Sequence, residues 1–110
     1  MGTERTIKIA KLNDELRTSF RGGSVCTTSG VEALPEDLRQ RLLSAVQGFR
    51  EFTEDNDPHG ERDCAVIEVE GTRLIWKIDY YDPTFSRLSE DASDPEVTRR
   101  VLTIMLAEEY

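Results

Sequence analysis

Side chains that can bind a cation recur at every second position of residues 55–63, a spacing typical of a loop that wraps Ca²⁺, although the fifth position is His59 where such a loop has Asp or Asn. A glycine, Gly60, stands at the sixth position, but the twelfth position is Val66, where such a loop needs a bidentate Glu. The pattern makes four residues candidate ligands for a divalent cation: Asp55, Asp57, His59 and Asp63. The alternative is a turn held by Asx side chains that bond to their own backbone.

His59 is the single histidine, so any Ser/His or Cys/His nucleophilic mechanism must use it. A zinc site would combine His59 with Asp63, Cys64 and Cys26, although the paired Cys-x-x-Cys spacing of strong zinc motifs is absent from the sequence. The commoner interpretation is that each cysteine is a small apolar residue of a strand. A bridge between the two cysteines stays open at this point.

Asp79 and Asp82 flank two tyrosines and form a further candidate carboxylate pair, for acid and base chemistry or for magnesium. Residues three apart on a strand point to opposite faces, so the two carboxylates converge only if the chain bends. The alternative is that Asp79 is a surface carboxylate paired with Lys77 or with a basic residue of a loop.

Negative charge is concentrated in the middle of the chain. The 110 residues carry 22 acidic and 14 basic side chains, a net charge of −8. Residues 51–96 hold 14 of the acids and only four of the bases, a balance of −10. This argues against general binding to phosphate backbones and favours a protein partner with a basic surface. The candidate partner-binding residues are Glu54, Asp55, Asp57, Glu61, Asp63, Asp79 and Asp82.

Three helices are expected to position these residues. Apolar residues at helical spacing predict a first helix over 3–20, with Ile9, Leu12, Leu16 and Phe20 on its inner face and Arg17 elsewhere. Pro35 and two acids predict the start of a second helix over 35–51. Asp94 as N-cap and Pro95 predict a last helix whose inner residues are Val97, Val101, Leu102, Met105 and Leu106.

Strands are expected at 24–29, 64–70 and 73–81. The last two alternate around Gly71-Thr72, which predicts a hairpin with a type II′ turn. The fold expected is a two-layer α+β domain, with three helices packed on a three-stranded, mainly antiparallel sheet in the order α-β-α-β-β-α. Glu108 and Glu109 oppose the dipole of the expected last helix, so they should fray or pair with nearby bases.

Length and hydropathy predict a single domain over residues 1–110, large enough for its own core. No apolar run approaches the length of a membrane span, and the N-terminus leads into an amphipathic stretch rather than a secretory segment. Two cysteines fit a reducing compartment, so a cytoplasmic location is expected.

Three segments together resemble a small bacterial family known only as a domain of unknown function. They are the loop 55–63, the strand 76–82 (WKIDYYD) and the C-terminal 100–110 (RVLTIMLAEEY). Members typically read Gly-Glu-His-Asp-Phe-Gly in the loop, where this chain has Arg62 in place of the His and Cys64-Ala65 in place of Phe-Gly. The resemblance implies no activity or cofactor. Members of the family resemble proteins encoded by phages, plasmids and chromosomes. By association, this implies roles in conflict with host defence.

The leading hypothesis is therefore a non-enzymatic acidic binding protein. In its more specific form, this protein is a mobile-element inhibitor that occludes a basic DNA-binding surface of a host defence complex. The alternative is a metal-binding domain or metal-dependent hydrolase centred on Asp55–Asp63. A monomer and a homodimer paired through an edge strand are both compatible with the sequence.

Overall fold

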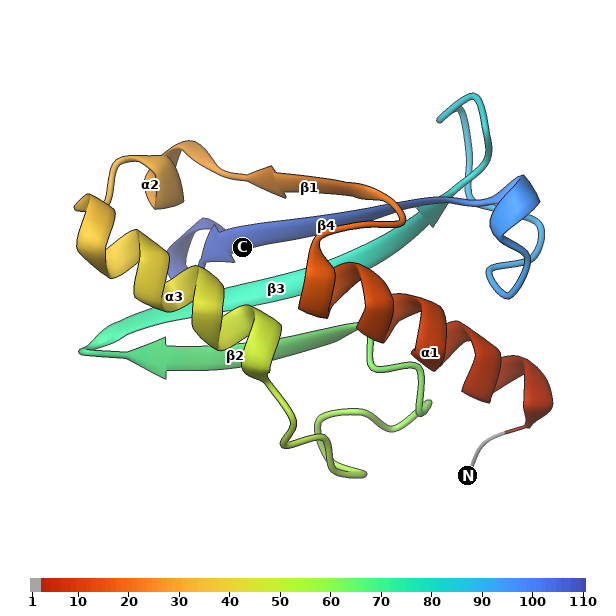
Figure 1. Cartoon of the computed structure of the whole chain (residues 1–110), viewed down its shortest axis with the longest axis horizontal. Coiled ribbons are helices and arrows are strands. Elements are labelled where there is room, and N and C mark those ends of the chain that lie inside the picture. The colour runs from red at the N-terminus through yellow and green to blue at the C-terminus, as the bar shows by residue number, and fades with distance from the viewer. Residues whose placement is uncertain (1–2) are drawn as a thin grey trace.

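The computed structural model describes residues 3–110 and shows helices on one face of a four-stranded mixed sheet (Figure 1). The first two residues lie outside the described part. The helices and strands are α1 (Glu4–Ser19), β1 (Ser24–Thr27), α2 (Ser29–Glu32), α3 (Glu36–Gly48), β2 (Cys64–Val69), β3 (Thr72–Tyr81) and β4 (Arg99–Leu106). Two short 3₁₀ turns complete the chain, η1 (Pro95–Val97) and η2 (Ala107–Glu109). No helix among residues 3–110 is both long and apolar enough to cross a bilayer.

The expected C-terminal helix and three-stranded sheet are wrong, because residues 99–106 form β4 in the interior of the sheet. The strand order is β1-β4-β3-β2, with β4 parallel to β1 and antiparallel to β3. A strand with neighbours on both sides can carry apolar residues on both faces, so its sequence is readily mistaken for a helical stripe. Asp94 does cap the next turn, since its Oδ1 accepts the Glu96 N–H at 2.9 Å, but that turn is only η1.

The predicted hairpin is confirmed, with a different turn. Strands β2 and β3 pair from Cys64↔Lys77 to Val69↔Thr72. The two connecting residues are Glu70 and Gly71, whose φ angles of 54° and 83° are both positive, as in a type I′ turn. This turn follows the right-handed twist of the strands and places the second connecting position at Gly71 rather than Thr72.

Helix α1 begins where predicted, but it is rotated about its axis. The Thr3 side chain caps it by accepting the Thr6 N–H at 3.1 Å. Its buried residues are Ile9, Asn13, Leu16 and Arg17, so an amide and a guanidinium face the sheet. Leu12 is only half-buried, and the expectation that Arg17 lies outside is wrong.

The apolar core lies between helices α1 and α3 and the sheet face they cover. Trp76 of β3 is fully buried at its centre and meets the rings of Phe49 and Phe52 edge-on, each with a centroid distance of 6.1 Å. Helix α3 and the β2–β3 hairpin supply much of it. The buried members are Leu16, Val31, Leu42, Val46, Ala65, Ile67, Leu74, Trp76, Ile78, Leu102 and Ile104.

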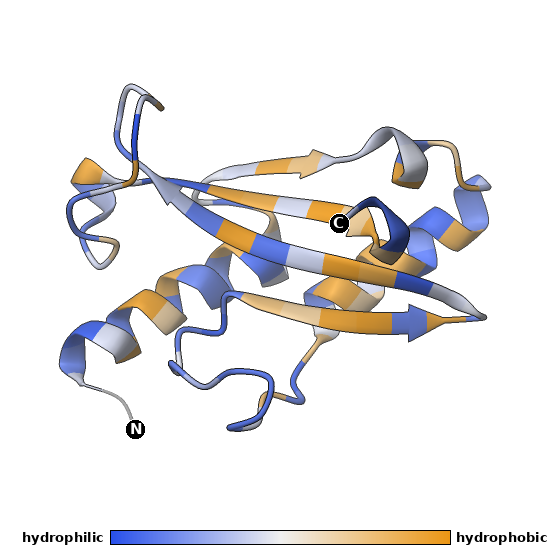
Figure 2. Cartoon of the chain, turned by 180° about the vertical axis from the view of Figure 1, so that it is seen from behind, coloured by the Kyte–Doolittle hydropathy of each residue, from blue (hydrophilic) through white to orange (hydrophobic). Residues whose placement is uncertain are grey.

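The opposite face of the sheet carries no helix, as Figure 2 shows from behind. One row across it runs Cys26, Thr103, Lys77 and Cys64, in register on β1, β4, β3 and β2. Three strand spacings separate the two cysteines, about 14 Å, which is too far for a disulfide. Both thiols are free and exposed, so the bridge left open above does not form within the chain.

Candidate functional site: the acidic loop

The loop from Thr53 to Asp63 is a turn bonded to itself. The Asn56 Oδ1 accepts the Thr53 N–H at 2.8 Å, and the Asp57 Oδ1 accepts the Arg62 N–H at 3.0 Å. Gly60 and Arg62 have positive φ angles, 74° and 55°, which turn the second half of the loop toward α1. The Asx-turn interpretation of this segment is confirmed.

The four candidate cation ligands do not gather around a common point. Within residues 3–110, no group of three or more His, Cys, Asp or Glu side chains is placed to hold a metal ion. Asp57 is engaged by the Arg62 N–H, and Asp63 lies at the start of β2, where its carbonyl accepts the Ile78 N–H at 2.7 Å. The zinc set of His59, Asp63, Cys64 and Cys26 is likewise dispersed, since its two cysteines stand on opposite edge strands.

Two ionic and polar contacts fix the loop to the rest of the fold. The Arg62 guanidinium bonds Asp14 of α1 at 2.9 Å and lies over the Phe52 ring, 5.2 Å from its centroid. The Glu61 carboxylate accepts the Tyr80 hydroxyl at 2.8 Å. The loop is thus held on one side by a helix and on the other by the central strand β3.

Behind Glu61 lies a buried polar network of Asn13, Tyr80 and Arg100. The Asn13 amide nitrogen donates to the Tyr80 hydroxyl at 2.8 Å and to the Glu61 carbonyl at 3.0 Å. Its oxygen accepts the Arg100 Nε–H at 2.8 Å, and Arg100 also donates to the Ala92 carbonyl. Burial raises the pKa of Tyr80, so its hydroxyl keeps its proton and donates to Glu61.

A second buried cation, Arg17, joins α1 to the end of α3. Its guanidinium donates to the carbonyls of Val46 and Gln47 at 2.9 and 3.2 Å, and to Asp14 at 3.1 Å. It lies 5.2 Å from the Trp76 ring centroid. Cations near a helix C-terminus satisfy its last carbonyls, so Arg17 caps α3. Asp14 therefore bridges Arg17 and the loop residue Arg62.

The seven candidate partner-binding carboxylates occupy different environments. Glu61 belongs to the buried network, and Asp79 accepts Lys77 at 2.6 Å, as the surface-pair alternative predicted. Asp82 organises its own turn by accepting the Ser86 N–H at 2.8 Å. Figure 1 places that turn and the loop at different corners of the molecule. Asp79 and Asp82 therefore have separate partners and do not act as a carboxylate pair.

Of the other four candidate carboxylates, Asp63 is half-buried beside β2, and three are carried by one turn: Glu54, Asp55 and Asp57. Glu54 and Asp55 are exposed, and Asp57 is half-buried with one oxygen engaged by the Arg62 N–H. In the part of the chain that the structure describes, none of the three lies within ion-pair distance of a Lys or Arg side chain. The uncompensated charge of the loop is therefore concentrated at its tip.

Next to the loop, a depression of about 550 Å³ opens on the helix-free face of the sheet. It is lined by residues that include Asp63, Cys64, Lys77, Asp79 and Tyr110. Burial raises the pKa of the Cys64 thiol, and the charge of Asp63 raises it further. A thiol in this state is protonated at neutral pH and is a poor nucleophile, which argues against cysteine catalysis at this position.

Sequence reasoning missed the residues that hold the loop: Asn13, Arg17 and Arg100. Asn13 and Arg17 are four apart and share the helix face of Ile9 and Leu16, so a polar pair inside an apolar face was the available signal. Arg100 had no comparable signal in the sequence, because the predicted last helix does not place it on the inner face of a strand, where β4 carries it.

A family model described as protein of unknown function (DUF3768) matches residues 27–109. No protein with a curated description and no solved structure matches the chain. The matched residues include the acidic loop and strands β2, β3 and β4, while α1 precedes them.

Proposed function

The chain belongs to the DUF3768 family, whose function is unknown, and we propose that it is a non-enzymatic binding protein. In this proposal the acidic loop docks on a basic surface of a protein partner. One observation supports it above the others: Glu54, Asp55 and Asp57 project, without basic partners among the described residues, from a turn fixed to the fold. Fixed charges lose little conformational freedom when they bind.

The chemistry of such a contact is electrostatic. Carboxylates held on a rigid turn attract a basic surface over roughly one Debye length, about 8 Å at physiological salt. They accelerate encounter and disfavour partners of the same charge. Binding should therefore weaken as salt rises.

A more specific form of the proposal concerns the partner. We propose that the basic surface is the DNA-binding face of a host defence nucleoprotein complex, which the loop occludes as a mobile-element inhibitor. A row of carboxylates can occupy the positions that phosphates would take on such a face. Support for this form comes from the resemblance to proteins of phages and plasmids.

The test uses amide substitutions that remove charge and keep the shape of the turn. E54Q/D55N/D57N retains the side-chain oxygen that accepts the Arg62 N–H. The partner is first captured from a bacterial lysate on the immobilised wild-type chain and identified by mass spectrometry. At low salt it should bind the variant at least about tenfold more weakly than the wild type. Double-stranded DNA should compete with the wild-type chain for it.

The matched control is E15Q/E90Q/E96Q, which removes three exposed carboxylates away from the loop. It changes the net charge equally and should bind like the wild type. Equal weakening in both variants would show that only total charge matters. Unchanged binding of the loop variant at all salt concentrations would refute the docking role of the loop.

The metal-dependent alternative has lost the geometry on which it was based. Because the candidate ligands do not converge among residues 3–110, Ca²⁺, Mg²⁺ or a chelator should leave the melting temperature unchanged. Thermal melts in each condition, with metal analysis of the purified protein, measure this. A rise in melting temperature that D55N/D57N abolishes would restore the metal hypothesis.

A further inference from the structure

The outer edge of β2 has unpaired backbone groups at Cys64, Val66 and Glu68. Strand β2 is last in the sheet order and pairs only with β3. The Ile78 N–H bonds the Asp63 carbonyl at 2.7 Å, which fixes the phase of the antiparallel ladder. Pairs alternate in such a ladder, so Ala65, Ile67 and Val69 bond β3, whereas the residues between them direct their N–H and C=O groups outward.

The sequence of this edge gives little protection from pairing, since its one charged residue is Glu68. Natural edge strands are usually blunted by Pro, Lys or a bulge, and Cys64–Val69 has neither residue and pairs with β3 in unbroken register. Val66, at its centre, has 55% of its surface exposed. The other edge strand, β1, has only four residues.

We propose that this edge pairs antiparallel with the same edge of a second copy of the chain, with Val66 on the two-fold axis. Three residues of each copy then bond: Val66 lies opposite Val66, and Cys64 lies opposite Glu68. The interface is isologous, as a closed dimer requires. The two four-stranded sheets become one continuous sheet of eight strands.

Side chains on the helix-free face fit this register. Val66, Ile75 and Met105 stand in one cross-strand row that ends at the edge. On pairing, the two rows meet at Val66 and form one apolar stripe across both copies. Cross-strand apolar contacts of this kind stabilise sheets.

Charge is complementary in the same register. Glu68 contacts Arg73 of its own copy at 3.4 Å. On its other side, Glu68 faces Cys64 of the second copy. The next residue in that row is Lys77 of the second copy, which pairs with this Cys64 across the β2–β3 ladder. Two strand spacings, about 10 Å between Cα atoms, separate Glu68 from that lysine, within reach of two long side chains. No two like charges lie directly opposite.

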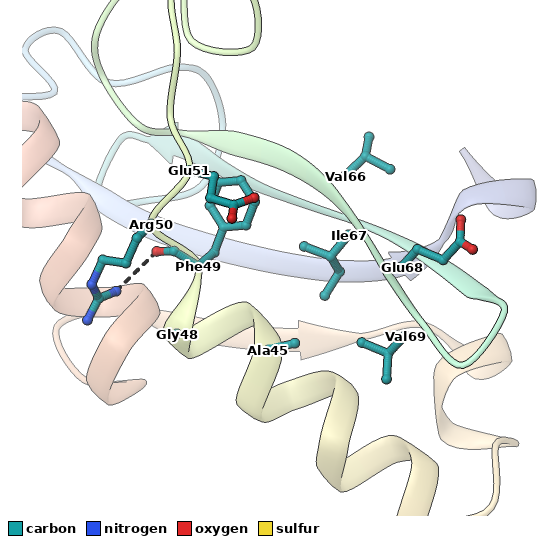
Figure 3. A pocket seen from close by; sticks show the side chains of 9 residues that line it. All are labelled: Ala45, Gly48, Phe49, Arg50, Glu51, Val66, Ile67, Glu68 and Val69. Carbon is teal, nitrogen blue, oxygen red and sulfur yellow. Dashed lines mark hydrogen bonds between the residues drawn. The ribbon is translucent and has the colours of Figure 1, made fainter.

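The helical side of the edge also has room for a second copy. A groove of about 400 Å³ runs between the end of α3 and β2, and Figure 3 shows Ala45, Ile67 and Val69 around it. Ala45 and Gly48 are the α3 residues beside the edge, and their small size lets the α3 of a second copy approach. Pairing therefore removes apolar groove surface from water as well as joining the backbones.

Solution mass is the direct test. By light scattering or sedimentation, the wild-type chain should have twice its 12.5 kDa mass at high concentration and dissociate on dilution. Val66→Lys places two like charges opposite each other at an exposed position, so it should raise the dissociation constant about tenfold or more. Circular dichroism should show that the variant stays folded.

Val101→Lys is the matched control, because it makes the same substitution on the same face at the centre of the sheet, opposite Asp79 rather than another base. It should leave the dimer intact, whereas dissociation by this variant would indicate stacking of the open faces instead. In a Cys26→Ser/Cys64→Ser background, Val66→Cys should form an intermolecular disulfide on oxidation and Thr103→Cys should not. A wild-type chain that stays monomeric at every concentration, or a Val66→Lys dimer of unchanged affinity, would overturn the proposal.

Discussion

At the scale of single residues, Asn13 has the largest expected effect on stability. Its amide is fully buried and bonds Arg100, Tyr80 and Glu61 at once. Asn13→Ala leaves the Arg100 Nε–H buried with no acceptor, so it should lower the free energy of unfolding by about 2–3 kcal/mol. Denaturant unfolding measures the change.

The control for this variant is Glu15→Ala, two positions along α1 on its exposed side. Surface helix substitutions usually change stability by less than about 0.5 kcal/mol. If the two substitutions changed the free energy of unfolding equally, the buried network of Asn13 would contribute no stability beyond that of an exposed helix position.

Arg62 should act on the loop rather than on the whole fold. Its ion pair with Asp14 is partly exposed, and exposed pairs contribute about 1 kcal/mol or less. Arg62→Ala should therefore lower global stability only slightly and increase amide exchange across residues 54–62. Hydrogen exchange read by mass spectrometry locates the change.

Arg73→Ala provides the comparison, because Arg73 also forms an exposed pair, with Glu68, away from the loop. It should leave exchange in the loop unchanged. If Arg62→Ala also left loop exchange unchanged, the Asp14 contact would not be what holds the loop.

At the scale of elements, Glu109 ties the chain end to the segment between β1 and α2. Its carboxylate accepts the Thr28 hydroxyl at 2.5 Å and the N–H groups of Leu106 and Gly30 at 2.9 and 3.1 Å. The expectation that Glu109 frays or pairs with a nearby base is wrong, because its partners are a hydroxyl and two backbone N–H groups. These hydrogen bonds, that of Thr28 first, hold the pKa of Glu109 below its ordinary value.

A lowered folded-state pKa makes this contribution sensitive to acid. The folded chain binds the Glu109 proton less readily than the unfolded chain does, so the stabilisation is full above about pH 5 and is lost as pH falls below about 4. Glu109→Gln should lower stability at pH 7 and show less loss between pH 6 and pH 3 than the wild type. Denaturant unfolding at each pH measures this.

Glu108→Gln is the adjacent control, since Glu108 is exposed. Its unfolding should follow the wild-type pH dependence. A Glu109→Gln profile that runs parallel to the wild type would show that this carboxylate does not anchor the chain end.

Elements whose apolar residues lie on one face were predictable from the sequence. Strand β4, which lies between two other strands, was not. Helix α3 and the hairpin bury the residues that their spacing indicates, such as Leu42, Val46 and Trp76. In β4 burial alternates at Arg100, Leu102 and Ile104. Hydropathy does not alternate, because Val101, Met105 and Leu106 are apolar too. Its identity depends on long-range pairing with β1 and β3, which local sequence does not encode.

At the scale of the whole molecule, the concentration of charge in the middle of the chain was predictable, but not its division among sites. The sequence shows which residues are acidic, and only the fold shows that Glu61 faces Tyr80, Asp79 faces Lys77 and Asp82 organises its own turn. These pairings join residues on different elements or depend on a turn geometry. They distinguish these three acids from the carboxylates at the loop tip, which have no such side-chain partner among the described residues.

Helix α1 lies outside the part of the chain that the family model matches. It supplies Asn13 and Asp14, which hold the loop, yet it precedes the residues 27–109 that the family model matches. A protein that shares only the matched residues lacks these two contacts and most of β1, although it keeps the Tyr80 contact and the hydrogen bonds within the loop. The loop is therefore fixed in part from outside the matched region, so alignment of that region alone does not carry its rigidity over to relatives.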